Sequence, residues 1–346
     1  MNPKVYIILL NYNDWSDTIM CLESIFRLDY LCYQVIVVDN GSINSSIDKI
    51  IDWAEGKLEV DFNPNDSLKD LYYPSTSKPI EYSFYERKDI EDEKIREDNV
   101  PLILIQTGEN LGYAGGNNVG IKYALLRDDF DYLWILNSDT LVDKDSLKSL
   151  VFQAESYKKE KKKIGIIGSK LLYYHNPKVL QGIGGEYNKI FGLSKHIGGF
   201  EEDKGQYDRE DIKIDYCIGA SILVSKEFIK DVGLMDEAYF LYFEDLDWAE
   251  RGRRKGYEAA YCWESKVYHK EGGSIGSSSK GKEKSELADF YGLRNRILFT
   301  RKFYPQFLLT VYLGYVGVIL NRIKRGQFNR VKLVFKAIFD AHNVSL

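Results

Sequence analysis

Residue types that build cross-linked or metal-rich small proteins are scarce in this sequence. Its 346 residues include only four cysteines and four histidines. The cysteines form no CxxC pair and no tight cluster, so neither a zinc site nor a disulfide framework is suggested, and a reducing, cytoplasmic setting fits. The length and a hydrophobic content of 44% predict an ordered chain with a substantial core, in one large domain or two ordinary ones.

Two common nucleotide-binding signatures are also missing. No GxGxxG follows the first predicted strand and no GxxxxGK[ST] occurs, which disfavours dinucleotide binding and P-loop ATPase activity. Only Lys4 precedes the first apolar run, and no small-residue cleavage site follows it. We therefore expect Met1–Asn13 to form a first buried strand and not a signal peptide.

Acidic residues are absent from positions 290–339, although the whole chain carries a net charge of −5. This segment contains ten cations: Arg294, Arg296, Arg301, Lys302, Arg322, Lys324, Arg325, Arg330, Lys332 and Lys336. They flank the apolar run Phe307–Leu320, which is short for a membrane span of about 20 residues. We expect this region to bind an anionic membrane surface, with a core helix or a homodimer contact as alternatives. No nucleic-acid motif accompanies the cations, so nucleic acid is not an expected partner.

Strand and helix signals alternate through the first 140 residues. The apolar runs predict strands at Val5–Asn11, Gln34–Asp39, Leu102–Gln106 and Tyr132–Leu136, with helices from about Asp17 and over Gly116–Leu126. This order predicts βαβ units and a parallel sheet. Because ligands of open α/β sheets bind at the carboxyl ends of the strands, polar residues at those ends are the first site candidates.

The later parts of the chain have other patterns. Residues 56–99, rich in proline, acids and tyrosine, predict a surface insertion with one hairpin near Glu81–Tyr85. Glycine-rich turns at Gly182–Gly185 and Gly198–Gly199 predict an antiparallel part, followed by a strand at Ile214–Val224. A helix is expected over Leu246–Lys255, and residues 271–284 are small and polar enough to form a loop.

Four polar clusters follow predicted strands or aromatic stretches: Asn11-Tyr12-Asn13, Asp39-Asn40, Asn137-Ser138-Asp139 and Glu244-Asp245. Asp39 could accept the imide N–H of a pyrimidine base while Tyr12 packs on the ring; the alternative is a turn cap. Asp139 could bind a hard divalent cation that bridges to diphosphate oxygens, with His269 as a second ligand. Glu244 or Asp245 could be a general base, or both could form the acidic first turn of the following helix.

In this order the clusters resemble the family-2 glycosyltransferases of GT-A fold, in particular the rhamnosyltransferase-like and galactofuranosyltransferase-like branch. The resemblance covers about residues 4–300 apart from 56–99. The matching residues are Asn11-Tyr12-Asn13, Val37-Val38-Asp39-Asn40-Gly41-Ser42, the stretch from Asn110 to Gly120, Leu136-Asn137-Ser138-Asp139-Thr140, Gly219-Ala220, the stretch from Phe240 to Asp247, and His269 with Gly273-Ser274.

The resemblance implies an α/β fold of the GT-A nucleotide-diphospho-sugar transferase type, a Rossmann-like mixed sheet flanked by helices. This catalytic domain would span residues 1–300. The cations and the apolar run predict a C-terminal helical, basic and apolar extension over 301–346 that associates with a membrane or mediates oligomerisation, and with it a cytoplasmic location, peripheral on the inner face of the cell membrane.

The implied reaction is inverting transfer from a pyrimidine nucleotide-diphosphate donor, dTDP-rhamnose or a UDP-sugar, to a glycan or lipid-linked glycan acceptor in cell-surface polysaccharide synthesis. Asp245 would be the catalytic base and Glu244 an orienting neighbour. Asp139 and His269 would hold a divalent cation, Mg²⁺ or Mn²⁺, and the loop 271–284 would close over the donor. The implied donor-binding residues are Asn11, Tyr12, Asn13, Asp39, Asn110, Gly112, Asn118, Asn137 and Asp139.

One position departs from the family pattern, because Asn137 stands where the metal signature usually begins with aspartate. Fewer carboxylates would then hold the cation. Two other functions remain as alternatives. A noncatalytic, membrane-associated scaffold that binds nucleotide sugars is opposed by the presence of Asp139, Asp245 and His269. A sugar-nucleotide pyrophosphorylase is disfavoured because the first strand leads into Asn11-Tyr12-Asn13 and not into a glycine-rich signature.

Overall fold

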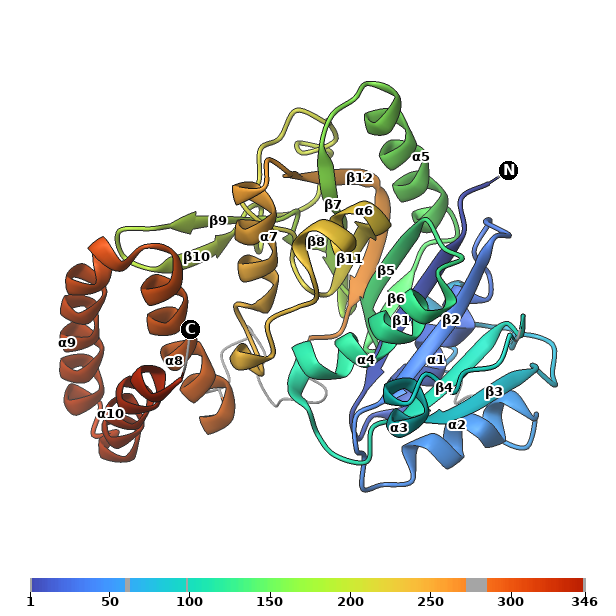
Figure 1. Ribbon diagram of the computed structural model, residues 1–346, viewed down its shortest axis with the longest axis horizontal. Coiled ribbons are helices and arrows are strands. Elements are labelled where there is room, and N and C mark those ends of the chain that lie inside the picture. Colours follow the sequence, from blue (N-terminus) through green and yellow to red (C-terminus); the bar gives the residue numbers. More distant parts are fainter. Residues whose placement is uncertain (1, 60–62, 98, 272–284, 345–346) are drawn as a thin grey trace.

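A ten-stranded mixed sheet forms the centre of the protein in the computed structural model, which describes residues 2–59, 63–97, 99–271 and 285–344 (Figure 1). The strand order is β3-β4-β2-β1-β5-β11-β7-β12-β6, and β8 pairs with β7. The strands of this sheet are β1 (Val5–Asn11), β2 (Tyr33–Asp39), β3 (Tyr82–Glu86), β4 (Leu102–Gln106), β5 (Tyr132–Asn137), β6 (Thr140–Val142), β7 (Ile164–Tyr173), β8 (Asn176–Gly182), β11 (Ser221–Ser225) and β12 (Glu258–His269). A separate hairpin, β9 (Gly185–Asn188) and β10 (Leu193–His196), extends toward the C-terminal helices (Figure 1).

Helices cover both faces of the sheet because the strands alternate their buried side chains. Tyr6 and Ile8 of β1 face a core shared with α4, α6 and α7, whereas Ile7 and Leu9 face a core shared with α1, α2 and α5. The helices are α1 (Trp15–Ile25), α2 (Ser46–Ala54), α3 (Arg87–Glu91), α4 (Gly112–Arg127), α5 (Ser146–Lys159), α6 (Lys226–Val232), α7 (Glu244–Arg254), α8 (Glu286–Phe303), α9 (Leu308–Lys324) and α10 (Phe328–Asn343), with short 3₁₀ turns at Lys69–Leu71, Glu237–Tyr239 and Pro305–Phe307.

The predicted parallel strands are confirmed, and their register brings three polar residues to one edge. Asn11 lies opposite Asp39 across the β1–β2 pair, and Leu10 lies opposite Asn137 across the β1–β5 pair. All three strands run in the same direction, so their carboxyl ends meet. The expected antiparallel part is also present in β8, β9 and β10.

Some predicted boundaries are wrong. Helix α1 begins earlier than expected, and Asp14 is its N-cap, accepting from the backbone N–H of Asp17. The strand expected at Ile214–Val224 starts only at Ser221, because residues before it form turns, and α7 includes Glu244 and Asp245 in its first turn.

The hairpin predicted near Glu81–Tyr85 is also wrong. This segment is the single strand β3, which pairs in parallel with β4 and extends the main sheet. The rest of the 56–99 segment is tied to the body by Glu23, a fully buried carboxylate. Glu23 accepts hydrogen bonds from Trp53 Nε1, the backbone N–H of Thr76 and Lys78 Nζ.

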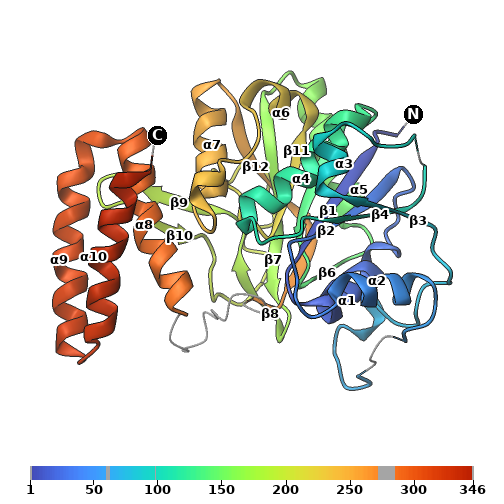
Figure 2. The ribbon, with the colours of Figure 1, turned by 60° about the horizontal axis from the view of Figure 1, so that its bottom comes forward.

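The last three helices form a bundle at one end of the molecule (Figure 2). Its own small core contains Ile297 of α8, Val311 and Tyr315 of α9, and Val334 and Ala337 of α10 among its members. Helix α8 continues through the expected boundary after residue 300. The division into domains at that residue stays a prediction. Within the described residues, one helical stretch, Pro305–Lys324, is long and apolar enough to cross a membrane by length and composition.

Candidate active site

Asp139 and His269 meet at the carboxyl edge of the sheet. Asp139 follows β5 and His269 ends β12; the Asp139 carboxylate Oδ1 lies 3.0 Å from His269 Nε2. Both side chains are buried, with 8% and 7% of their surface exposed. Burial tends to raise the pKa of Asp139, but the neighbouring His269 outweighs it and the pKa is lowered. Burial likewise acts to lower the pKa of His269, yet Asp139 raises it.

Gln181 fixes the orientation of this imidazole. Its Oε1 lies 2.9 Å from His269 Nδ1 and can only accept, so Nδ1 carries a proton. Nε2 is thereby left to face Asp139. A metal-binding histidine usually donates its second N–H to such an outer partner, which sets the tautomer and the ring direction.

The Asp139–His269 pair fits a divalent cation. Two ligand atoms at the corners of an octahedron with bonds of about 2.1 Å are separated by ~3.0 Å, and the observed separation of Oδ1 and Nε2 is 3.0 Å. The Asn137 amide Nδ2 lies 3.3 Å from the same nitrogen. No cluster of three or more His, Cys, Asp or Glu side chains suited to a metal occurs among the described residues. A cation held by this pair therefore needs further oxygen ligands from a bound molecule, and diphosphate oxygens suit that need.

Asp245 lies in the first turn of α7, after an unusual backbone segment. Phe240, Tyr242 and Phe243 all have positive φ angles, which turn the chain sharply before the helix. Asn295 of α8 stabilises this segment, because its side-chain amide donates to the backbone carbonyls of residues 239, 241 and 242. The Asp245 carboxylate accepts from the backbone N–H groups of Gly219 and Leu246. Burial raises the pKa of Asp245 to about 6.

Tyr113 connects the Asp245 side of the site with the Asp139 side. Its hydroxyl donates to the backbone oxygen of Gly219 at 2.6 Å, and Gly219 in turn donates to Asp245. Burial raises the pKa of Tyr113, and the charges of Glu244, Asp245 and Asp139 raise it further. The backbone N–H of Asn137 donates to the carbonyl oxygen of Ala220, the residue after Gly219, so the predicted base and the predicted metal ligand lie along one edge of the sheet.

Glu244 is a buried acid with an unsatisfied oxygen. Only 6% of the residue is exposed, and its Oε2 has no hydrogen-bond partner among the described residues. Burial raises the pKa of Glu244 well above its ordinary value, and the adjacent Asp245 raises it further. Such a group holds a proton that the unfolded chain releases, so the folded state loses stability as pH rises above about 4.5.

We expect Glu244→Gln to raise thermal stability at alkaline pH. Glutamine has the same shape and does not titrate, so it avoids the cost of ionising a buried acid. The melting temperature of the variant should exceed that of the wild type by ~2 °C at pH 8.5 and by less at pH 5. Calorimetry at the two pH values checks this. If the difference in melting temperature between variant and wild type does not grow with pH, ionisation of Glu244 does not destabilise the folded state.

Asn11 and Asp39 form a buried pair at the same edge of the sheet as the predicted metal ligands. Asn11 Nδ2 donates to Asp39 Oδ1 at 2.6 Å and also contacts Ser42 Oγ at 3.1 Å. Asp39 is fully buried, and its other oxygen accepts from the backbone N–H of Ser42. Asn13, which has a positive φ angle, supports the same turn through the N–H of Ile43. The network shapes the loop after β2, and contact of Asp39 with a base stays a prediction, as does packing by the half-buried Tyr12.

Asn110 and Gly112 organise the start of α4. The Asn110 side-chain oxygen accepts from Asn40 Nδ2 and from the backbone N–H of Gly112. Gly112 has a φ of +73°, and an added Cβ would lie 2.4 Å from the carbonyl oxygen of Phe240. That oxygen also accepts a hydrogen bond from the backbone N–H of Tyr113 at 2.6 Å, which fixes it in place. A side chain at position 112 would therefore collide with it, and only glycine fits. The helix start is thus bonded to the loop that carries Asp245.

Asn118 is buried deeper in α4. Its amide donates to the backbone oxygen of Met235 and to Glu237, and its oxygen accepts from the N–H of Met235. These contacts tie α4 to the segment before Asp245, and a direct contact with the donor stays a prediction. Gly273, Ser274 and residues 272–284 of the expected lid lie outside the described residues.

Comparison with known proteins points to one class of enzyme, although no family model matches the chain. The chain is 22% identical over 244 residues to the low-salt glycan biosynthesis hexosyltransferase Agl10 of Haloferax volcanii, covering 68% of this chain and 73% of that protein. It is 23% identical over 317 residues to the dTDP-rhamnosyl transferase RfbF of Shigella flexneri, covering 90% and 84%. The chain is a glycosyltransferase, and it is similar to the family-2 enzymes.

Solved structures agree with this glycosyltransferase in fold. The mannosyltransferase PcManGT from Pyrobaculum calidifontis, in complex with GDP-Man and Mn²⁺, is 14% identical with a TM-score of 0.51, over 100% of this chain and 77% of that one. GalNAc-T7 with UDP, GalNAc and Mn²⁺ is 13% identical with a TM-score of 0.55, over 86% and 48%. The expected GT-A fold is confirmed.

Sequence reasoning missed three residues of this candidate site. Gln181 could not be identified, because no sequence motif around it indicates the hydrogen bond that it makes with His269. Tyr113 stood inside a glycine-rich motif without an assigned role. Lys270 directly follows His269, and its ammonium group pairs with Asp17 of α1. A strand-end position next to a predicted ligand is the signal that could have found it.

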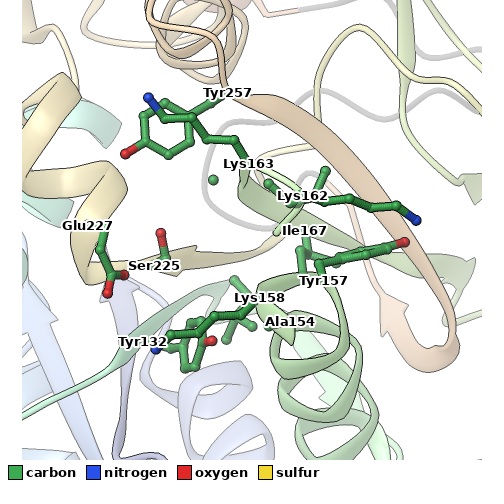
Figure 3. A pocket seen from close by; sticks show the side chains of 13 residues that line it. Tyr132, Ala154, Tyr157, Lys158, Lys162, Lys163, Ile167, Ser225, Glu227 and Tyr257 are labelled. Carbon is green, nitrogen blue, oxygen red and sulfur yellow. The ribbon is translucent and has the colours of Figure 1, made fainter. Parts of the chain in front are cut away.

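A separate cavity of about 270 Å³ lies at the amino ends of the parallel strands. Figure 3 shows side chains that line it. It is lined by Tyr132 at the start of β5, Ile164 at the start of β7 and Ser225 at the end of the antiparallel β11, with Lys163 and Tyr257 nearby. These positions are at the amino ends of the parallel strands. The cavity therefore belongs to neither the metal pair nor the Asp245 loop.

Proposed function

We propose that this glycosyltransferase transfers a sugar, with inversion, from a nucleotide-diphosphate donor bound at the Asp139–His269 pair. One observation carries the proposal: Asp245 accepts from the backbone N–H of Gly219, and the next residue, Ala220, accepts from Asn137 at the strand end that leads to the Asp139–His269 pair. A cation ligand and a titratable base within one site are the two groups that such a displacement requires.

The chemistry assigned to the chain's own residues is a single displacement. The Asp245 carboxylate takes the proton from an acceptor hydroxyl as that oxygen attacks the anomeric carbon. The bond from that carbon to the diphosphate oxygen breaks on the opposite side, so the configuration inverts. A divalent cation at Asp139 and His269 would neutralise the charge that develops on the leaving diphosphate. The ammonium group of Lys270 also lies near this pair, where it helps to lower the pKa of Asp139, and it is itself paired with Asp17.

The relatives guide the choice of donor and acceptor. Agl10 is named as a hexosyltransferase of glycan biosynthesis and RfbF as a dTDP-rhamnosyl transferase. We therefore propose dTDP-rhamnose or a UDP-sugar as donor, and a glycan or lipid-linked glycan of the cell surface as acceptor. Recognition of the pyrimidine would fall to Asp39, which needs the Ser42 turn to open because the carboxylate is fully buried.

A thermal-shift screen of nucleotide sugars with Mn²⁺ tests the donor assignment. A ligand at a hundredfold excess over its Kd stabilises the folded state by about 2.7 kcal/mol, which is several degrees in melting temperature. We expect dTDP-rhamnose or a UDP-sugar to give the largest shift and GDP-sugars a smaller one. A GDP-sugar that outperforms every pyrimidine donor would contradict the proposed role of Asp39, while no shift with any donor would contradict the proposed function itself.

A further inference from the structure

The outer side of helix α9 carries a continuous apolar stripe. Its members follow one another at intervals of four and three residues, so they lie on one side of the helix. They are all exposed: Leu309, Leu313, Val316, Leu320 and Ile323. The opposite side of α9 is fixed in the bundle, where Val311 and Tyr315 are buried and the Tyr315 hydroxyl donates to the backbone oxygen of Leu293. Helix α9 therefore has one side packed into the bundle and an opposite apolar side that no described residue covers.

The tip of the β9–β10 hairpin extends this apolar stripe. Gly192 packs on Val311 and Arg296, and the hydroxyl of Thr310 donates to the backbone oxygen of Ile190. The guanidinium of Arg296 holds the tip through the carbonyl oxygen of Phe191. The tip exposes three further apolar side chains, Ile190, Phe191 and Leu193. We call this stripe and tip together the α9 surface; it lies at the end of the molecule away from the sheet (Figures 1 and 2).

The charges of the bundle are not distributed as the sequence alone indicated. Four of the ten cations pair with acids: Arg294 with Asp340, Lys302 with Asp236 and Asp247, and both Arg322 and Arg330 with Asp289. Arg296 and Arg301 donate to backbone carbonyls. Four exposed cations have no ion pair with a described residue: Lys324, Arg325, Lys332 and Lys336. They stand at the carboxyl end of α9 and along α10.

We propose that the α9 surface is a docking site for an anionic lipid membrane, on which α9 lies in the interface with Lys324 and Arg325 at its carboxyl end and the exposed Lys332 and Lys336 on the neighbouring α10. Interfacial helices combine an apolar face with Lys and Arg that meet anionic headgroups, each worth about 1 kcal/mol near the surface. A second copy docked on this surface is the alternative outcome that the light-scattering measurement below tests. A spanning α9 would have to abandon its contacts with α8. The cytoplasmic leaflet, rich in anionic lipid, is the membrane surface that fits.

Vesicle sedimentation with a double substitution tests this docking. The full chain should bind vesicles of phosphatidylcholine and phosphatidylglycerol at low ionic strength, and 0.5 M salt, on the order of a 4 Å screening length, should release most of it. Leu313 and Leu320 are 62% and 61% exposed, so L313D/L320D should leave the fold intact and weaken binding at least about tenfold. Phe152 on α5 is 73% exposed and distant from the bundle, and F152D should bind as the wild type does.

Circular dichroism and light scattering accompany the vesicle assay. Full-length protein that ignores anionic vesicles at low salt would overturn the proposal. A folded L313D/L320D protein that binds vesicles as well as the wild type would also overturn it. The same holds if the double substitution only converts a dimer into a monomer and leaves vesicle binding unchanged. Binding that resists both high salt and alkaline carbonate would mean that α9 spans the bilayer. These results do not depend on the donor or on turnover, so they are independent of the proposed function.

Discussion

Replacing Asp245 with asparagine should lower the rate of sugar transfer by about 10²–10⁴-fold, the usual contribution of a general base. Asparagine keeps the shape and can still accept from the backbone N–H of Gly219, so the α7 loop should remain in place. It cannot take the acceptor proton. The variant should therefore bind the donor as the wild type does, and a fold assay, a thermal shift with donor and a transfer assay together separate these effects.

Glu244→Gln is the matched control for this experiment. It changes the adjacent acid in the same helical turn, and we expect it to lose much less transfer than D245N. In the wild type, transfer should fall as pH drops below about 6, since burial raises the pKa of Asp245 to about 6 and only the ionised form is a base. A D245N rate within about tenfold of wild type, roughly 1.4 kcal/mol of barrier, would assign the base elsewhere.

Chelation should abolish transfer, and Mn²⁺ or Mg²⁺ should restore it. Asp139 supplies the carboxylate of the proposed site and His269 the imidazole, and losing either leaves one protein ligand. Asp139→Ala should therefore reduce transfer by at least about 10²-fold at any metal concentration that supports the wild type. Titration of Mn²⁺ by calorimetry in the presence of nucleoside diphosphate gives a second readout, in which the variant should show no binding.

Asp143→Ala controls for the loss of an acid near the site. Asp143 lies four residues further on, is partly exposed, and its carboxylate accepts only from the backbone N–H of Asp145 within the described contacts. It should keep both metal binding and transfer. Full activity of the wild type after exhaustive chelation, or of D139A, would show that the Asp139–His269 pair does not hold an essential cation.

The sequence predicted which polar residues meet at the strand ends, while their chemical roles stay predictions. β1, β2 and β5 are short apolar runs that end in polar residues, and parallel pairing alone brings Asn11, Asp39 and Asn137 together. His269 was a candidate second ligand from its place after an aromatic-rich stretch, and the family resemblance supported that role, but no spacing rule links β12 to β5. Its partner Gln181 could not be predicted, since that contact depends on how β8 and β12 both flank β7.

Where the sequence predictions failed, long-range packing decided the structure. The tyrosine-rich segment around β3 was expected to form a hairpin. Instead, β3 pairs in parallel with the edge of β4 over its whole length. Likewise, the basic C-terminal segment contains no acids from 290 to 339, yet Asp289 and Asp340 stand just outside it. Together with Asp236 and Asp247 they neutralise four of its cations. A count along the chain cannot show such pairs.

Release of nucleoside diphosphate is the most direct test of the central claim. The purified protein is incubated with Mn²⁺ and the donor that gives the largest thermal shift, with wild type, D139A and D245N measured side by side and a glycan acceptor added or omitted. We predict that the wild type releases nucleoside diphosphate, faster with acceptor, and that the two variants release it at least about a hundredfold more slowly. A wild-type protein that binds the donor and never releases nucleoside diphosphate, with any acceptor offered, would be a binding scaffold and would contradict the account.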